Sequence, residues 1–422
     1  MSKIKRIWAR EILDSRANPT VETGCLLDSG HVVATSVPSG SSRGSYEAVE
    51  LRDNDPDRFL GRGVLKAVEN VNSVLGPAIV GMDPREQVAI DNKLIQIDGT
   101  ENKSKLGGNA ILSVSLVVAK AGAIAANTNQ YFWINYLAQQ SGNKCKVKMP
   151  TPLFNMINGG LHGAGNLDFQ EFHVIPVTTK SFYEGLQECV EIYLTIGQNL
   201  SRRGAIHSVG DEGGYAPNLF TNADALEVFV ESIRQTKYQL GRDVFLGLDV
   251  AAGSFYKNGE YTIRDKSASM DDNQLLEFYK SLNEQYKLAL IEDPFYEDGW
   301  ESWKKIVNEL SKDLIIVGDD LLATNPKRVK KAIEEKACNA ILVKPNQIGT
   351  LSETLNVIKM AKDANWKIVV SHRSGETNDS VIADFAVGIG ADYVKFGAPA
   401  RGERVAKYNR LSAIESELTF QK

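Results

Sequence analysis

The chain has 422 residues, of which 43% are hydrophobic and 24% charged, as in an ordinary soluble globular protein with room for two or three domains. Its formal net charge of -5 and its pI near 5.7 argue against nucleic acid as the main partner but leave a small anionic substrate open. The N-terminal segment has no apolar stretch long enough for a signal peptide, so we expect a cytoplasmic protein.

The first part of the chain predicts an α+β domain. Two β-type runs, residues 21–27 and 31–37, flank Asp28, Ser29 and Gly30, which is a hairpin signal. Helical patterns follow at residues 84–97 and 109–126. Ser113, Ser115 and Lys120 interrupt the second of these, so we expect a buried helix and no membrane span.

A domain boundary is predicted near residue 143. Gly142, Asn143 and Lys144, followed by Pro150 and Pro152, break the preceding helical pattern. We therefore assign residues 1–143 to an N-terminal α+β capping domain and residues 144–422 to a catalytic domain. The four cysteines, Cys25, Cys145, Cys189 and Cys338, lie far apart without Cys-x-x-Cys spacing, which indicates unpaired thiols in a reducing compartment.

The second part shows a repeat of apolar runs that each end in polar residues. The runs are residues 169–171, 206–212, 245–249, 288–293, 314–320, 340–344, 367–373 and 393–395. Helical patterns separate most of them, which predicts a parallel sheet. So many repeats favour a closed eight-stranded α/β barrel, whose catalytic residues gather at one end. An open doubly wound sheet is the alternative, although no Gly-rich dinucleotide loop follows an early strand.

Three acids, Asp249, Glu292 and Asp319, each end an apolar run. Carboxylates converging from three strands would repel one another, and a hard divalent cation would relieve that repulsion. Oxygen ligands favour magnesium or manganese over zinc. The alternative is that each acid caps the helix that follows it.

Lys344 and Lys395 also end apolar runs. A lysine at the inner end of a barrel strand needs a partner or a function. A metal and a second lysine nearby would depress its pKa and suit it to act as a base. A salt-bridged structural lysine is the alternative for either residue.

Three further segments carry candidate groups for phosphate binding and for proton transfer. His372, Arg373 and Ser374 follow an apolar run and offer a guanidinium fork and a hydroxyl to a phosphate, unless Arg373 pairs with Glu376 or an acid of the metal cluster. Glu212 in a glycine-rich turn and Glu171 at a strand end are candidates for acid–base catalysis, with turn chemistry as the alternative for Glu212.

Two glycine- and serine-rich loops, residues 39–44 and 158–165, suit lids that close over a reacting substrate. His162 in the second loop could reach a phosphate, and simple solvent exposure is its alternative.

Nine segments, taken in order, resemble the enolase family. They are AREILDSR (9–16), EAVELRD (47–53), QEF (170–172), GDEGG (210–214), IEDPF (291–295), VGDDL (317–321), NQIGTLS (346–352), SHRSGE (371–376) and GAPARGER (397–404). The likeness runs from about residue 4 to residue 410. It implies an N-terminal α+β domain on an atypical eight-stranded α/β barrel, and a homodimer or a higher even oligomer.

The resemblance also implies roles for individual residues. Asp249, Glu292 and Asp319 would hold a first Mg²⁺, and Ser42 would join a second Mg²⁺ that bridges to the phosphate. The remaining roles fall to Lys344 as base, Glu212 as acid with Glu171 in support, Lys395 facing the substrate carboxylate, and Arg373 and Ser374 on the phosphate with His372 and His162 nearby.

The implied reaction is the magnesium-dependent dehydration of 2-phosphoglycerate to phosphoenolpyruvate in glycolysis, and its reverse in gluconeogenesis. Ser41 and Arg43 depart from the family's usual first lid, Ala17 replaces a usual Gly, and Phe396 stands where Thr is common. Arg43 and the unusual loop around His162 motivate an alternative, a divergent family member that acts on a modified phospho- or phosphono-substrate, similar to the carboxyphosphonoenolpyruvate synthases. A non-catalytic binding role would predict damaged catalytic positions, and the sequence shows none.

Overall fold

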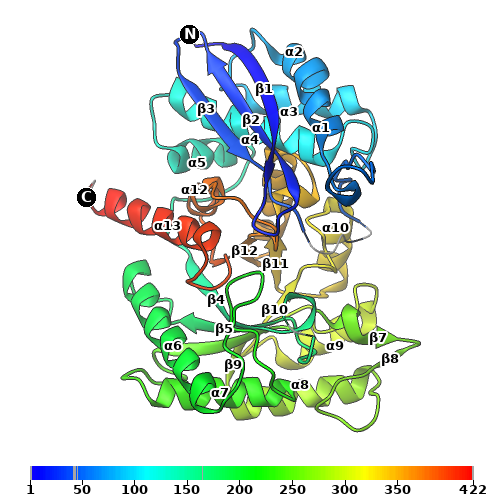
Figure 1. Cartoon of the computed structure of the whole chain (residues 1–422), viewed down its shortest axis with the longest axis vertical. Coiled ribbons are helices and arrows are strands. Elements are labelled where there is room, and N and C mark those ends of the chain that lie inside the picture. The colour runs from blue at the N-terminus through cyan, green and yellow to red at the C-terminus, as the bar shows by residue number, and fades with distance from the viewer. Residues whose placement is uncertain (1, 41–43, 45, 164, 421–422) are drawn as a thin grey trace.

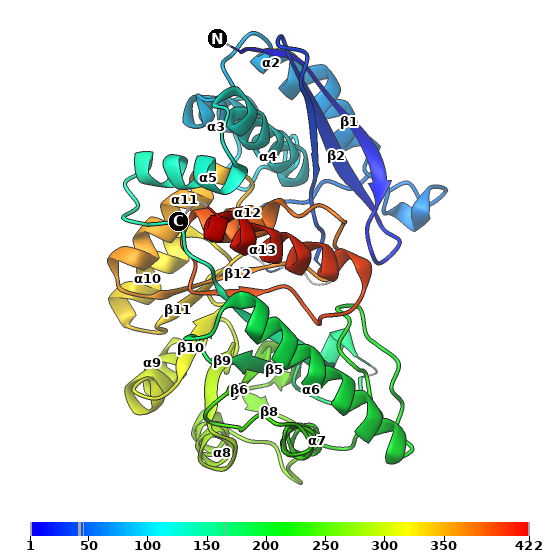
Figure 2. The same ribbon diagram turned by 90° about the vertical axis from the view of Figure 1, so that its left-hand side faces the viewer.

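The computed structural model describes residues 2–40, 44, 46–163 and 165–420. It has an N-terminal α+β part, at the top of Figure 1, and a barrel below it. Figure 2 shows the C-terminal helix α13 at the level where the two parts meet. The expected fold class is therefore confirmed, whereas the exact boundary at residue 143 stays a prediction.

The N-terminal part packs a three-stranded antiparallel sheet, in the order β1-β2-β3, against helices. Its elements are β1 (Ile4–Leu13), β2 (Pro19–Leu27), β3 (Val32–Ser36), α1 (Leu65–Asn70), α2 (Gly76–Ile79), α3 (Gln87–Asp98), α4 (Gly108–Ala125) and α5 (Gln130–Gln140). A π-helical turn, Val71–Leu75, joins α1 to α2. The predicted hairpin is present, and Gly30 takes the left-handed φ of 88° that its turn requires.

Helix α4 is the central helix of this part. By length and hydropathy alone it could cross a membrane, but 83% of its most apolar window is buried inside the protein. That pattern is typical of a core helix, as the sequence predicted. All four cysteines are free, as predicted, and all four are buried.

The barrel closes with eight strands in the order β10-β11-β12-β13-β4-β5-β6-β9, which rules out the open sheet. The strands are β4 (Thr151–Asn158), β5 (Glu171–Pro176), β6 (Val244–Asp249), β9 (Leu288–Glu292), β10 (Ile315–Gly318), β11 (Ala340–Val343), β12 (Lys367–Ser371) and β13 (Tyr393–Lys395). The surrounding helices are α6 (Phe182–Arg202), α7 (Asn222–Arg234), α8 (Asp272–Tyr286), α9 (Trp300–Leu310), α10 (Pro326–Glu335), α11 (Leu351–Asp363), α12 (Val381–Gly388) and α13 (Gly402–Phe420). A short hairpin, β7 (Tyr256–Lys257) and β8 (Glu260–Tyr261), extends from the loop after β6.

One predicted strand was wrong and one was missed. Residues 206–212 belong to the connection between α6 and α7, where Ile206 and Val209 are exposed and Glu212 is buried. The eighth strand is β4, whose residues from Pro152 onward are all buried. Pro152 looked like a break, but proline is tolerated near the start of a strand, where few ladder hydrogen bonds are lost.

The sheet is also not wholly parallel. β5 runs antiparallel to both β4 and β6, while the other neighbours in the barrel are parallel. Glu171 therefore begins a strand rather than ending one. Because β5 is reversed, its first residue pairs with Asn158 and Asp249, the last residues of β4 and β6. Glu171 thus reaches the same barrel end as the other predicted site residues.

A buried carboxylate joins the two parts of the molecule. Asp91 on α3 accepts hydrogen bonds from the backbone N–H of Ser352 at 3.0 Å and from its hydroxyl at 2.6 Å, at the start of α11. Gln87 donates to the other carboxylate oxygen at 3.0 Å. Burial raises the pKa of Asp91 to about 6, although these hydrogen bonds oppose the rise.

This contact predicts a pH-dependent stability. The folded-state pKa of Asp91 lies above its ordinary value of 3.8, so its stabilising contribution is complete at low pH and is lost as pH rises towards 6. Asp91→Asn keeps an acceptor for Ser352 but cannot ionise. The melting temperature of the variant relative to the wild type should therefore increase between pH 5 and pH 7.5, measured by calorimetry. A difference that does not change with pH would contradict this account.

Candidate active site

The predicted site residues gather at one end of the barrel because of strand periodicity. Residues two apart in a strand face the same side of the sheet. Leu290, Val317 and Leu342 belong to an apolar cluster inside the barrel, and Glu292, Asp319 and Lys344 follow them by two positions. The charged groups therefore lie above an apolar plug that closes the barrel beneath them.

One pocket collects nearly all of the predicted groups. Its lining includes His162, Glu171, Glu212, Asp249, Asp319, Lys344, His372, Arg373, Ser374 and Lys395. Glu292 is buried just beneath and contacts the pocket through Lys395. Ser42, the predicted ligand of a second metal, lies outside the described residues, as do Ser41 and Arg43.

Lys395 lies among three buried carboxylates. Its Nζ is 2.8 Å from Oδ2 of Asp249, 2.8 Å from Oε1 of Glu292 and 3.3 Å from Oε1 of Glu171. Burial raises the pKa of Glu292 well above its usual range, and repulsion by Asp249 adds to the rise. Burial lowers the pKa of Lys395, but the carboxylates outweigh it and the net pKa is well above normal.

Lys344 forms a close ion pair with Asp319. Burial is the largest influence and lowers the pKa of Lys344, but Asp319 together with the other nearby carboxylates leaves the pKa raised. The depressed pKa expected from the sequence requires a metal beside the lysine and stays a prediction. The expected effect of Lys395 and of other cations is present but smaller than that of this one carboxylate. Lys344 is thus held as an ammonium while Asp319 is its partner.

The donor set at this end fits a hard divalent cation. Asp249, Glu292 and Asp319 are buried, converge from three strands and repel one another. None caps the next helix, since α8, α9 and α10 begin after Asp271, Gly299 and Asn325. Carboxylate oxygens with no sulfur ligand are typical of magnesium sites.

The sequence argument missed Asp293, which follows Glu292. Its two carboxylate oxygens accept the backbone N–H groups of Asp319 and Asp320, at 2.9 and 2.8 Å. Ligand atoms of these three aspartates lie within 4.8 Å of one another. The sequence did carry a signal for Asp293, because IEDPF and VGDDL each contain two adjacent acidic residues. Asp293 fixes the loop that presents Asp319.

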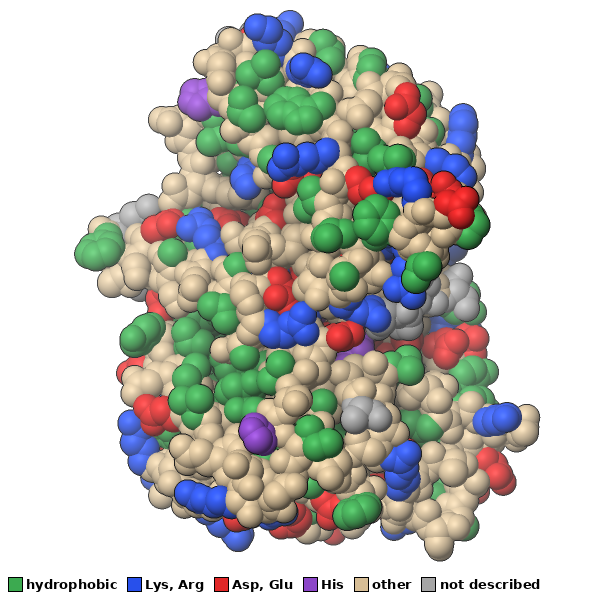
Figure 3. Space-filling view, in the orientation of Figure 1, with side chains coloured by type: hydrophobic (Ala, Val, Ile, Leu, Met, Phe, Trp, Pro, Cys, Tyr) green, Lys and Arg blue, Asp and Glu red, His purple; other side chains and the backbone are tan. Residues whose placement is uncertain are grey.

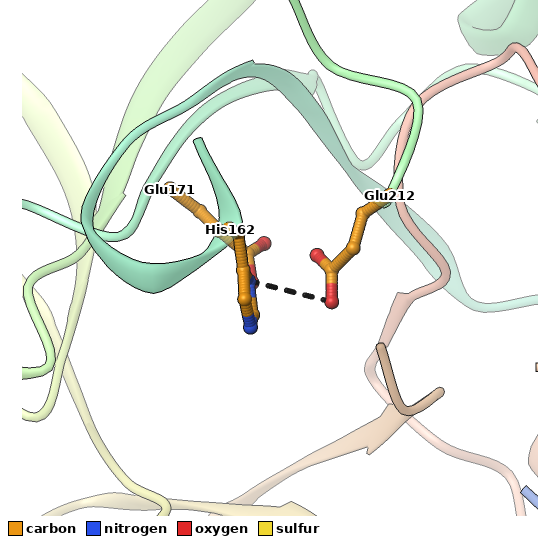
Figure 4. A group of neighbouring side chains, drawn as sticks. All are labelled: His162, Glu171 and Glu212. Atoms are coloured by element: carbon orange, nitrogen blue, oxygen red, sulfur yellow. Dashed lines mark ion pairs between the residues drawn. The ribbon is translucent and has the colours of Figure 1, made fainter. Parts of the chain in front are cut away.

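Glu212 and Glu171 face each other across His162, as Figure 4 shows. The Nδ1 of His162 is 3.5 Å from Oε1 of each glutamate. His162 is 9% exposed, so it is not merely a solvent-facing loop histidine. Burial lowers the pKa of His162, but Glu212 and Glu171 raise it to about 10. Glu212 is therefore more than a turn residue.

Both glutamates have further partners. Asn155 donates to Oε2 of Glu212 at 3.1 Å, and Nε2 of His372 is 3.4 Å from the same oxygen. His173, two residues along β5, is 3.0 Å from Oε2 of Glu171. Burial would raise the pKa of Glu212, but His162 and His372 outweigh it and lower the pKa well below normal.

Arg373 is buried and pairs with Glu47 of the N-terminal part. Its Nη1 is 3.0 Å from Oε2 of Glu47 and 3.2 Å from Oδ1 of Asn346. The alternative partner, Glu376, instead pairs with Lys407 at 2.9 Å. Glu47 lies within the quoted segment EAVELRD, but its partner could not be inferred from sequence because the two residues are far apart in the chain.

The N-terminal part covers this side of the site. Ser39 and Gly375 exchange backbone hydrogen bonds of 2.8 Å in both directions. A Cβ at residue 375 would lie 2.8 Å from the backbone oxygen of Ser39 and 2.3 Å from Oδ2 of Asp14, so glycine allows the two backbones to approach this closely. Arg16 reaches Asp211 at 2.8 Å, beside Glu212. Charged side chains of both signs mix along the boundary visible in Figure 3.

Comparison with known protein families agrees with this arrangement in both parts of the molecule. Residues 4–134 match the family described as the N-terminal domain of enolase. Residues 146–422 match the family described as the C-terminal TIM barrel domain of enolase.

The Lys395 cluster predicts a stability defect that a cation can repair. Lys395→Met leaves Asp249 and Glu292 buried without their ammonium, so the free energy of unfolding near pH 7 should fall by about 3–5 kcal/mol. Millimolar Mg²⁺ should restore part of the loss in denaturant titrations.

The control is Lys407→Met, which also removes a buried ammonium, paired with Glu376. Its deficit should not respond to Mg²⁺. Equal responses of the two variants would show that the cation does not act at the Lys395 cluster.

Proposed function

The chain belongs to the enolase family, and we propose that it catalyses the magnesium-dependent dehydration of 2-phosphoglycerate to phosphoenolpyruvate and the reverse hydration. One observation carries the proposal. A single pocket brings together buried carboxylates, two strand-end lysines, a glutamate flanked by histidines, and an arginine with a serine. These are the groups needed to remove a proton beside a carboxylate and to expel a hydroxyl from a phosphorylated substrate.

Asp249, Glu292 and Asp319 would hold the first magnesium, and Ser42 would join a second. The bound cations would supply positive charge to stabilise the substrate dianion formed on proton removal. Without a cation, the ammonium groups of Lys395 and Lys344 compensate the same carboxylates.

Lys344 would be the general base that takes the proton next to the substrate carboxylate. Its pKa is raised by Asp319, so the base must lose that counter-charge before it can accept a proton. If Asp319 made its contacts with another group instead, Lys344 would lose this counter-charge and its pKa would fall. Lys395, fixed at the strand end of β13, would face the substrate carboxylate.

Glu212 would act as the general acid that protonates the leaving hydroxyl. His162, His372 and Asn155 surround its carboxylate, and Glu171 shares His162 with it. A proton on Glu212 must therefore compete with these donors. Glu171 would support the proton network from the neighbouring strand.

The phosphate would bind Arg373 and Ser374, with His372 and His162 nearby. In the structure, the guanidinium of Arg373 contacts Glu47, so an arriving phosphate would replace or share that carboxylate. Phosphate binding would then change the contacts of Glu47 in the N-terminal part.

The first test is phosphoenolpyruvate formation followed by ultraviolet absorbance, with 2-phosphoglycerate and excess Mg²⁺. Lys344→Ala should lower kcat by about 10²–10⁴-fold and abolish solvent exchange of the substrate C2 proton, because it removes the base. Glu212→Gln should lose dehydration but keep that exchange, because it removes only the acid.

Both variants should keep their circular dichroism spectra and their Mg²⁺ response. Loss of exchange in Glu212→Gln with retention in Lys344→Ala would reverse the assigned roles. No turnover by folded wild type would reject 2-phosphoglycerate as the substrate.

The alternative of a modified phospho- or phosphono-substrate depends on Arg43, which lies outside the described residues. If Arg43 selects an extra anionic group, Arg43→Thr should raise kcat/KM for 2-phosphoglycerate. Unchanged kinetics would count against this alternative.

We also propose a place for the protein in glycolysis and gluconeogenesis, a cytoplasmic location, and a homodimer or higher even oligomer. These proposals follow from family membership and the sequence, with a small-molecule substrate and no nucleic-acid or membrane partner. Sedimentation velocity of the purified chain would give its oligomeric state.

A further inference from the structure

One buried arginine, Arg404, joins the phosphate-binding segment to the loop that carries Glu212. It lies in the first turn of α13 and is 0% exposed. Its Nη1 donates to the carbonyl of Arg373 at 2.6 Å, and its Nη2 donates to the carbonyls of Ser374 at 2.6 Å and Asp211 at 3.1 Å. A single guanidinium thus holds the backbone of two active-site segments.

The same guanidinium also contacts an active-site histidine. Nη1 of Arg404 is 2.8 Å from Nδ1 of His372. An arginine side chain offers only donors and stays protonated, so Nδ1 must be the acceptor. A neutral imidazole that accepts at Nδ1 carries its proton on Nε2, the nitrogen that lies 3.4 Å from Oε2 of Glu212.

We infer that Arg404 is a positioning residue that holds His372 in the neutral Nε2–H form and thereby keeps a second positive charge away from Glu212. The inference deepens the proposed function and rests on it, because the benefit concerns Glu212 as the general acid. Arg404 would not touch the substrate, and it would act only through His372 and the two backbone segments.

The benefit is electrostatic. His162 already places one imidazole between Glu212 and Glu171. A second imidazolium, at His372, would hold Glu212 more firmly as a carboxylate, whereas a general acid must carry a proton before it can give one away. A neutral imidazole at His372 leaves Glu212 without that second charge.

The charged groups around His372 divide into two sets. Glu212, Glu171 and Glu376 are carboxylates and favour the imidazolium, whereas the guanidinium of Arg404 disfavours it. Burial lowers the pKa of His372, and Arg404 adds to that lowering in opposition to Glu212. Burial and Arg404 together outweigh the carboxylates, so the electrostatic environment and the geometry favour the same neutral form.

The direct test is nitrogen-15 NMR of the full-length protein labelled at its histidine side chains. The chain has five histidines, so the signals of His372 are identified by their absence in His372→Gln. At pH 7 the wild type should show a protonated Nε2 and an unprotonated Nδ1 at His372. An Nδ1–H form or an imidazolium would overturn the inference, whether or not any variant folds.

The variant test is Arg404→Met, which keeps the bulk of the side chain but removes every donor. His372 should then show mixed tautomers or an imidazolium near pH 6–7. The kcat should fall by about 10–100-fold with a much smaller change in KM, and the acidic limb of the pH–rate profile should move. A variant that keeps the pure Nε2–H form and the wild-type profile would overturn the proposal.

Arg401→Gln is the matched control. Arg401 also lies beside this loop, with Nη1 3.1 Å from the carbonyl of Gly210 and Nη2 2.9 Å from that of Ser15, so its guanidinium holds backbone carbonyls and not the His372 ring. Its loss should leave the His372 tautomer unchanged. Since the NMR measurement needs no turnover, a failed tautomer prediction is distinguishable from failure of 2-phosphoglycerate as a substrate.

Discussion

Mutual repulsion among buried carboxylates at one end of the barrel is the constraint on which the rest of the structure depends. Asp249, Glu292 and Asp319 lie where the strands converge, above an apolar plug that excludes water from below. Such a cluster is unfavourable unless cations compensate it. The ammonium groups of Lys395 and Lys344 provide that compensation in the structure, and the same carboxylates suit a divalent cation.

The surrounding parts of the molecule can be understood as supports for this charged centre. Asp293 ties down the backbone that carries Asp319, and Glu47 from the N-terminal part neutralises Arg373. On the other side, Arg404 binds the backbone that flanks Glu212. Each support is a charged side chain whose partner lies in another segment, so the site cannot be assembled by the barrel strands alone. The N-terminal part is therefore a component of the site as well as a cover over it.

Proton handling depends on how two histidines differ. His162 lies between two glutamates, which raise its pKa, whereas His372 lies between Glu212 and a guanidinium, and burial lowers its pKa. The same residue type thus offers a charged neighbour on one side of Glu212 and a neutral imidazole on the other. Environment, and not residue type, separates the two roles.

Local sequence determined the hairpin of β2 and β3, the buried helix α4, most barrel strands and nearly all the groups that line the pocket, because apolar periodicity and strand-end polarity are local consequences of burial. Only the tertiary structure decided the reversed direction of β5, the inclusion of β4, and the partners Glu47, Asp293 and Arg404. Strand direction depends on how the sheet closes, since a buried run looks alike in either direction. The partner of a buried charge depends on which distant segments meet it, and the pattern around a single residue carries no record of that meeting.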